Sequence, residues 1–112
     1  MHETYNALAE DLKAIGIPCA ENDWNTRPRA PYITYALEFP AETLYADDQK
    51  VLEAWEGSID LYTTGKYGNG YAEMIEAALN KHCDGCWRRE TNGRWDRETN
   101  EFHFEWVFQT ED

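Results

Sequence analysis

The residue types best suited to metal or redox chemistry occur together after position 82. Cys83 and Cys86 form a C-x-x-C pair, a spacing that can supply two thiolate ligands to zinc or form a redox couple. A redox pair of this kind is expected to open a helix after a strand, whereas this pair follows a helical pattern. We therefore interpret Asp84-Gly85 as a turn that ends the helix, with two incidental thiols beside it. Zinc binding remains the alternative, with Cys19 and either His82 or His103 as the other ligands.

Two other patterns are compatible with chemistry but have a simpler explanation. His103 lies between Glu101 and Glu105 at strand spacing, which fits a metal or acid–base site and also fits the polar outer face of a strand. We favour the outer face. The Gly65-Lys66 pair suggests a phosphate-binding loop, but the motif fails because the upstream glycine is missing and Tyr67 replaces the hydroxyl residue. Neither pattern therefore predicts a catalytic residue, a cofactor or an enzyme activity.

The composition is that of a small, strongly acidic globular chain. Its 112 residues fit one domain spanning 1–112, with 42% hydrophobic and 29% charged residues. The formal net charge is -12, from 22 acidic and 10 basic side chains. This charge disfavours binding to nucleic acid or to an anionic membrane and favours solubility or a basic partner. The odd count of 3 cysteines suits a reducing cytosol, and we expect neither a membrane span nor a signal peptide.

Helical spacing of apolar residues occurs in two places. Tyr5, Leu8 and Leu12 predict a helix over residues 3–15, ended by Gly16. The two helices are expected to cover the sheet that the remaining segments form. The second helix is predicted over residues 71–82, with an apolar stripe of Tyr71, Met74, Ile75, Ala78 and Leu79.

Alternation of apolar and polar residues predicts the strands of one sheet. The longest alternating run, residues 51–62, is expected to be the central strand. Asn92-Gly93 is a strong hairpin-turn dipeptide and is predicted to join strands 86–91 and 94–99. Strands and helices together predict a single α+β domain, with a mostly antiparallel sheet flanked by two helices. The other strands are expected at 17–22, on the sheet edge, at 32–39 and at 101–109.

Aromatic and arginine side chains concentrate in two segments of this acidic chain. Tryptophan and arginine are favoured at the energetic centres of protein interfaces, so both segments are candidate contacts with another subunit or a partner. The simpler alternatives are a solvated loop for the first segment and a hairpin balanced by its own carboxylates for the second. The first segment contains Trp24, Arg27 and Arg29, and the second contains Trp87, Arg88, Arg89 and Arg94.

An ordered set of short motifs extends along nearly the whole chain. The first helix ends in Ile15-Gly16-Ile17-Pro18, and the later motifs are Pro31-Tyr32-Ile33-Thr34-Tyr35, Tyr45-Ala46-Asp47-Asp48, Ser58-Ile59-Asp60-Leu61-Tyr62-Thr63 and the aromatic strand Phe102 to Phe108. In this order the chain resembles the tail terminators of long-tailed bacteriophages (siphophages), a family of small tail-completion or minor tail proteins. The glycine-rich loop, the C-x-x-C pair and the arginine-rich C-terminal segment depart from the family pattern.

The resemblance implies an α+β fold and a ring, usually a hexamer of the same chain, that caps the finished tail tube. Such a ring stops polymerisation of the tail tube protein and offers the surface that joins the tail to a head-completion or connector protein. The chain would then belong to the virion tail and would be assembled in the cytoplasm of the host bacterium. DNA would pass through the ring without being specifically bound, which agrees with a net charge of -12. The family supplies no catalytic residues.

Other classes of function remain compatible with the sequence. A head-side completion or adaptor protein of the connector would also be small and acidic. A small acidic phage protein could instead inhibit a host protein. A metal or redox module would use Cys83 and Cys86. The oligomeric state and the zinc content of the purified protein separate these alternatives.

Overall fold

The main sheet of the molecule has five strands in the order β1-β2-β5-β7-β6. β1 runs parallel to β2, and the other neighbouring strands of this sheet are antiparallel. With two helices, this is the single α+β domain with a mostly antiparallel sheet that the sequence predicted.

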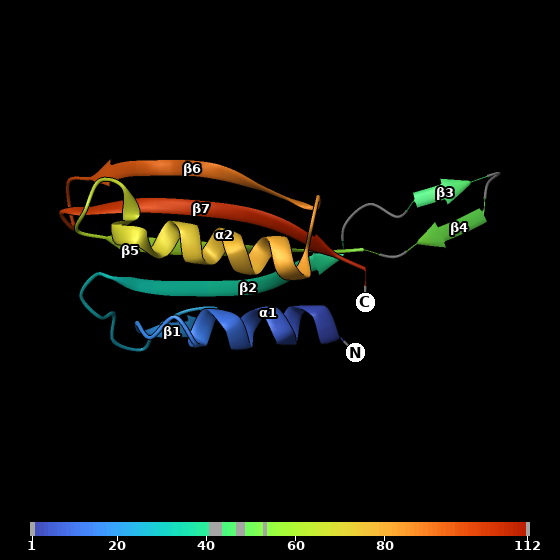
Figure 1. Ribbon diagram of the computed structural model, residues 1–112, viewed down its shortest axis with the longest axis horizontal. Coiled ribbons are helices and arrows are strands. Elements are labelled where there is room, and N and C mark those ends of the chain that lie inside the picture. The colour runs from blue at the N-terminus through green and yellow to red at the C-terminus, as the bar shows by residue number, and fades with distance from the viewer. Residues whose placement is uncertain (1, 41–43, 47–48, 53, 112) are drawn as a thin grey trace.

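The computed structural model describes residues 2–40, 44–46, 49–52 and 54–111. Its elements in chain order are α1 (Glu3–Lys13), β1 (Cys19–Glu21), β2 (Tyr32–Pro40), β3 (Leu44–Ala46), β4 (Gln49–Leu52), β5 (Trp55–Thr63), the short 3-10 helix η1 (Gly68–Gly70), α2 (Tyr71–His82), β6 (Trp87–Asp96) and β7 (Glu101–Thr110) (Figure 1).

Both helices pack on the same face of the main sheet. Ile33 pairs with Leu61 across β2 and β5, and Leu61 pairs with Phe104 across β5 and β7, so the three side chains form one row on one face. This row joins a single hydrophobic core with Leu8 of α1 and Leu79 of α2. Because side chains alternate along a strand, the residues between these positions point to the face without helices.

The two helices were predicted with nearly correct limits. In α1, Tyr5, Leu8 and Leu12 are buried as expected. In α2 the predicted stripe is wrong at Met74, which is 51% exposed, whereas Ala72 is 1% exposed. The buried stripe of α2 consists of Ala72, Ile75, Ala78 and Leu79, so the helix is rotated toward Ala72 relative to the prediction. None of the helices in the described ranges is long and apolar enough to cross a membrane.

The run at 51–62 is not one strand, contrary to the prediction. Its first residues belong to β4, which pairs with β3 in a separate two-stranded sheet, and β5 begins at Trp55. Pro40 of β2 pairs with Trp55 of β5, so the chain between them leaves the main sheet. Figure 1 shows this β3–β4 hairpin projecting beyond the end of the main sheet. Asp47 and Asp48 of the Tyr45-Ala46-Asp47-Asp48 motif lie outside the described residues.

The predicted hairpin turn at Asn92-Gly93 is a bulge within β6, and the two strands predicted on either side of it are one strand. The register of β6 against β7 shifts between Asn92 and Arg94. Gly93 has φ 74°, a conformation that favours glycine at such a bulge. The chain reverses instead at residues 97–100, where the backbone N–H of Asn100 donates to the carbonyl of Asp96 at 2.9 Å.

Candidate functional site

The face of the main sheet opposite α1 and α2, here called the helix-free face, is built from cross-strand rows. Each row collects the outward side chain of β2, β5, β7 and β6 at one level of the sheet. The register between strands fixes which residues share a row. The rows are Tyr32–Tyr62–His103–Arg94, Thr34–Asp60–Glu105–Thr91 and Ala36–Ser58–Val107–Arg88.

Three rings stack side by side in the first row. The centroid of Tyr32 lies 4.8 Å from that of Tyr62, and the centroid of Tyr62 lies 4.6 Å from that of His103, with interplanar angles of 17° and 10°. The guanidinium carbon of Arg27 lies 5.6 Å from the Tyr32 centroid and 5.5 Å from the Tyr62 centroid, within cation–π range. Burial raises the pKa of Tyr62 to about 12, so its hydroxyl stays protonated at neutral pH. The three rings therefore form one stack across the strands, and its Tyr32 end is only 2% exposed.

A buried carboxylate fixes the β1–β2 loop to the edge of this face. Glu101, 7% exposed, accepts a hydrogen bond from the Arg27 guanidinium and another from the Ala30 backbone N–H at 3.2 Å. Trp24 of the same loop meets the ring of Tyr32 edge-on, with 6.2 Å between centroids. Charge-assisted hydrogen bonds of this kind are stronger than neutral ones, so the loop is held above the aromatic row.

Carboxylates crowd the second row. Asp60 and Glu105 are direct cross-strand partners, a placement in which like charges repel. The Nε2 atom of His103 lies 2.7 Å from Oδ1 of Asp60. The hydroxyl of Ser58 donates to Glu38 at 2.8 Å, which adds a further carboxylate to this region. Burial, together with the charge of Asp60, raises the pKa of Glu105 above its ordinary value.

Two shallow hollows flank Tyr62 on the helix-free face. The first, of about 370 Å³, lies between the β1–β2 loop and Asp60. The second, of about 490 Å³, lies against the β6–β7 turn. Exposed arginine and tryptophan side chains beside a shallow hollow are typical components of a binding surface, and they lie at the second hollow. The second hollow is lined by Tyr62, Arg94, Trp95, Asp96, Arg97, Glu98 and His103.

The structure divides the residues predicted as interface contacts between the two faces of the sheet. Trp24 and Arg27 border the helix-free face, and Arg94 lies on it as the cross-strand partner of His103. The two predicted segments therefore meet at one surface, which the sequence did not indicate. Of the others, Arg29 is exposed in the β1–β2 loop, Arg88 is on the helix-free face in an ion pair with Glu90, and Trp87 and Arg89 face α2.

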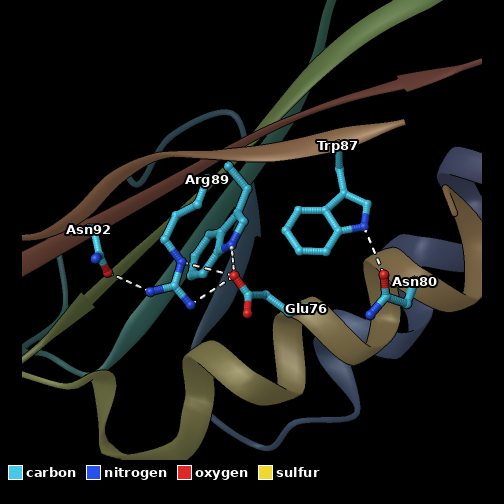
Figure 2. Close-up of polar contacts among 6 residues, drawn as sticks. Glu76, Asn80, Trp87, Arg89 and Asn92 are labelled. Carbon is cyan, nitrogen blue, oxygen red and sulfur yellow. Dashed lines mark hydrogen bonds and ion pairs between the residues drawn. The ribbon is translucent and has the colours of Figure 1, made fainter. Parts of the chain in front are cut away.

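Figure 2 shows Arg89 and Trp87 reaching from β6 to α2. Oε2 of Glu76 accepts hydrogen bonds from Nε of Arg89 at 2.9 Å and from Nε1 of Trp106 at 2.8 Å. A second guanidinium nitrogen of Arg89 lies 2.7 Å from the same oxygen. Nε1 of Trp87 donates to Oδ1 of Asn80 at 3.0 Å. Arg89 thus has a carboxylate partner inside its own chain and holds β6 against α2.

The C-x-x-C segment forms the predicted helix-ending turn. The backbone N–H of Cys86 donates to the carbonyl of Cys83 at 2.8 Å, and Gly85 between them has φ 78°. Cys83 is buried and Cys86 is exposed. His82 lies 2.7 Å from Oδ2 of Asp11, which joins α2 to α1. In the part of the chain that the structure describes, no three His, Cys, Asp or Glu side chains gather where they could hold a metal ion.

The sequence analysis did not predict the aromatic row, although it placed each of its rings on a predicted strand. Tyr32 and Tyr62 fall on the polar side of two alternating strands, where a tyrosine reads as an isolated surface residue. Their contact with each other and with His103 depends on the register of three strands. The usable signal was an aromatic residue at a polar position in each of several strands expected to be neighbours.

The chain matches no protein-family model, and a search of curated proteins finds no match.

Proposed function

We propose that this protein is a structural component of a phage virion, a tail terminator whose ring caps the tail tube, ends tube polymerisation and offers the surface that joins the head. The ring consists of copies of this chain and, by the resemblance described above, is expected to be a hexamer. The observation that carries the proposal is the β3–β4 hairpin, which forms a two-stranded sheet apart from the main one.

The hairpin is an extension that the main sheet does not need. Pro40 and Trp55 are cross-strand partners, so a short turn could join β2 directly to β5. The chain instead runs outward and pairs Leu44 with Leu52 at the base of the hairpin. A two-stranded hairpin is marginally stable alone in water and gains stability by packing on other structure. An adjacent copy in a ring provides that structure.

The strongly acidic character of the chain supports the same proposal. A ring on the DNA path must let DNA pass without retaining it, and a net charge of -12 repels the phosphate backbone. Acidic side chains are therefore expected along the channel of the assembled ring. A channel lined by basic side chains would contradict this part of the proposal.

The first test is the mass of the purified protein, measured by light scattering during size-exclusion chromatography at several concentrations. A tail terminator is expected to give the mass of a closed ring, visible as such by negative-stain electron microscopy. Added to a polymerising tail tube protein, it is expected to limit the length of the tubes. Unchanged tubes together with binding to a connector protein would favour the head-side alternative, and a monomer that binds neither would favour an inhibitor.

A hairpin variant tests the observation itself. Replacing residues 41–53 by Asn-Gly leaves a short turn between Pro40 and Ala54 and keeps the pairing of β2 with β5. We expect this variant to retain the circular dichroism spectrum of the main fold and to elute as a monomer. A milder variant, Leu44→Thr with Leu52→Thr, keeps the chain length. Glu73→Ala, at an exposed position of α2, is the matched control and should assemble like the wild type.

The decisive result is the mass of the shortened variant. A folded variant that still forms rings would show that the hairpin is not the contact that builds them. It would remove the main support for the proposal. Loss of assembly in the shortened variant and in the double threonine variant, with normal assembly of the control, would support it.

A further inference from the structure

The basic residues are unevenly distributed along the long axis of the molecule. Figure 1 places the β1–β2 loop, the β5–η1 connection and the β6–β7 turn at one end of the main sheet, here called the loop end, and the hairpin and both termini at the other. The loop end carries half of the 10 basic residues of the chain, although the net charge of the chain is -12. These residues are Arg27, Arg29, Lys66, Arg97 and, near the end of β6, Arg94.

Two arginines, at the end of β6 and in the β6–β7 turn, are available for an external partner. Arg94 and Arg97 are exposed, and neither forms an ion pair with a side chain that the structure describes. Trp95 between them packs against Phe102 of β7, with 4.7 Å between the ring centroids, and is still 47% exposed. Arginine and tryptophan at an accessible position are the residue types most often found at energetic centres of interfaces.

The centre of the helix-free face offers the complementary charge. Asp60 and Glu105 face each other across β5 and β7, and Glu38 lies nearby on β2. Among side chains that the structure describes, neither Glu38 nor Glu105 has a lysine or arginine partner. An arginine placed there would relieve the repulsion between Asp60 and Glu105.

Arg97 cannot fill this position in its own chain. Arg97 lies in the turn before β7, and Glu105 is the fifth residue of β7. At about 3.3 Å per residue, the carboxylate is roughly 13 Å along the strand from the turn. Arg94 lies in the adjacent row, opposite His103, and among the described side chains it forms no ion pair with Glu105. The position beside Glu105 is therefore open to an arginine of another molecule.

We propose that the helix-free face of one copy receives the loop end of the next, with Arg97 of one copy against Glu105 and Asp60 of the other. This inference rests on the ring proposed above. The contact joins two different surfaces of the same chain, so it is heterologous, and a rotation that closes makes it a ring. Tyr62 and Val107 on either side of the carboxylates provide the surface on which Trp95 of the incoming copy packs.

Charge reversal with mixing tests the contact directly. Glu105→Arg and Arg97→Glu are each expected to weaken assembly at least tenfold, measured as the concentration at which the ring mass appears in light scattering. An equimolar mixture of the two variants should recover assembly, because each variant then meets a neighbour of opposite charge. Only a direct contact between copies predicts this recovery. Glu73→Arg, an equal charge change at an exposed position of α2, should assemble like the wild type.

A second variant distinguishes a lost contact from a folding defect. Glu105→Gln removes the charge with almost no change of size and should weaken assembly less than Glu105→Arg. Circular dichroism of every variant checks that the fold is kept.

The outcomes separate this inference from the proposed function. Rings that persist unchanged in Glu105→Arg and Arg97→Glu would overturn the contact and leave the ring proposal standing. Variants that lose assembly and do not recover on mixing would also overturn it. A wild-type protein that stays monomeric at every concentration would count against both. A Glu105→Arg variant that assembles normally but no longer binds the tail tube protein would assign this face to a foreign partner and overturn the inference.

Discussion

Glu105 keeps a carboxylate at a position where its own fold disfavours a charge. It faces Asp60 directly across two strands, and burial raises its pKa, with Asp60 adding to the effect. Glu105→Gln removes the repulsion without changing the size of the side chain. We expect the free energy of unfolding at pH 7 to rise by about 0.5 kcal/mol, the scale of one cross-strand charge pair. Urea unfolding of the monomeric state measures the change.

The pH dependence of this change has a definite sign. A raised carboxyl pKa means that the folded chain binds the proton more tightly than the unfolded chain, so the destabilisation is present above that pKa and disappears as the pH falls below the ordinary value of about 4.3. Glu105→Gln and the wild type should therefore converge at low pH. Glu98→Gln in the exposed β6–β7 turn is the control and should show neither effect. A destabilised Glu105→Gln at pH 7 would contradict the argument.

Gly57 marks a close approach between strands of the main sheet. A Cβ at this position would lie 2.5 Å from the carbonyl oxygen of Ala36 and 2.5 Å from Cζ of Phe108. The carbonyl belongs to the backbone of β2 and has little freedom to move. Gly57→Ala should therefore cost about 1–3 kcal/mol by overpacking, measured by urea unfolding. A cost below about 0.5 kcal/mol, the scale of a neutral surface change, would mean that the sheet adjusts freely at this point.

At the scale of elements, Glu76 is the link between α2 and the sheet. Its carboxylate accepts hydrogen bonds from Trp106, which is fully buried, and from Arg89. Glu76→Ala leaves the indole N–H of Trp106 without its acceptor and should cost about 1–3 kcal/mol in the free energy of unfolding. Glu73→Ala, one turn earlier on the same helix and exposed, is the control.

A double-mutant cycle identifies the origin of that cost. Trp106→Phe removes the donor, so Glu76→Ala should cost less in that background than in the wild type. Equal costs in both backgrounds would show that the hydrogen bond to Trp106 contributes little and that the ion pair with Arg89 dominates.

Elements defined by local pattern were predictable, and elements defined by pairing were not. Helices α1 and α2 follow from apolar spacing over one stretch of chain, and β7 follows from plain alternation. Asn92-Gly93 has the sequence of a hairpin turn, yet it becomes a bulge because β6 stays paired with β7 on both sides of it. The division of the run at 51–62 likewise follows from the pairing of Pro40 with Trp55, which alternation does not reveal.

At the scale of the whole molecule, the same reasoning explains which part of the candidate site could be predicted. Trp24, Arg27 and Arg94 were identified from residue type, because tryptophan and arginine stand out in an acidic chain. The strand register and the bulges of β6 place these residues at one face and direct Arg89 to the opposite, helix-covered face. Strand register is a property of the assembled sheet, so the composition of single segments could not reveal the aromatic row.

The net charge predicts how the thermal stability of the whole molecule depends on salt concentration. Raising the salt concentration from about 0.02 M to about 0.5 M shortens the screening length from roughly 20 Å to roughly 4 Å. Repulsion within a chain of net charge -12 then weakens, so the melting temperature of the unassembled protein should rise. A melting temperature that falls with salt would show that attractive pairs outweigh the repulsion.

The pairing of Pro40 with Trp55 has a consequence for how this protein can evolve. The segment between them begins and ends at positions that the main sheet already holds together, so its length and sequence can change while the flanking strands stay in place. The recognition proposed above for the hairpin can then diversify separately from the stability of the core. In the proposed ring, exchange of this one segment between related chains would change which neighbouring subunit is bound, and the main sheet would remain the same.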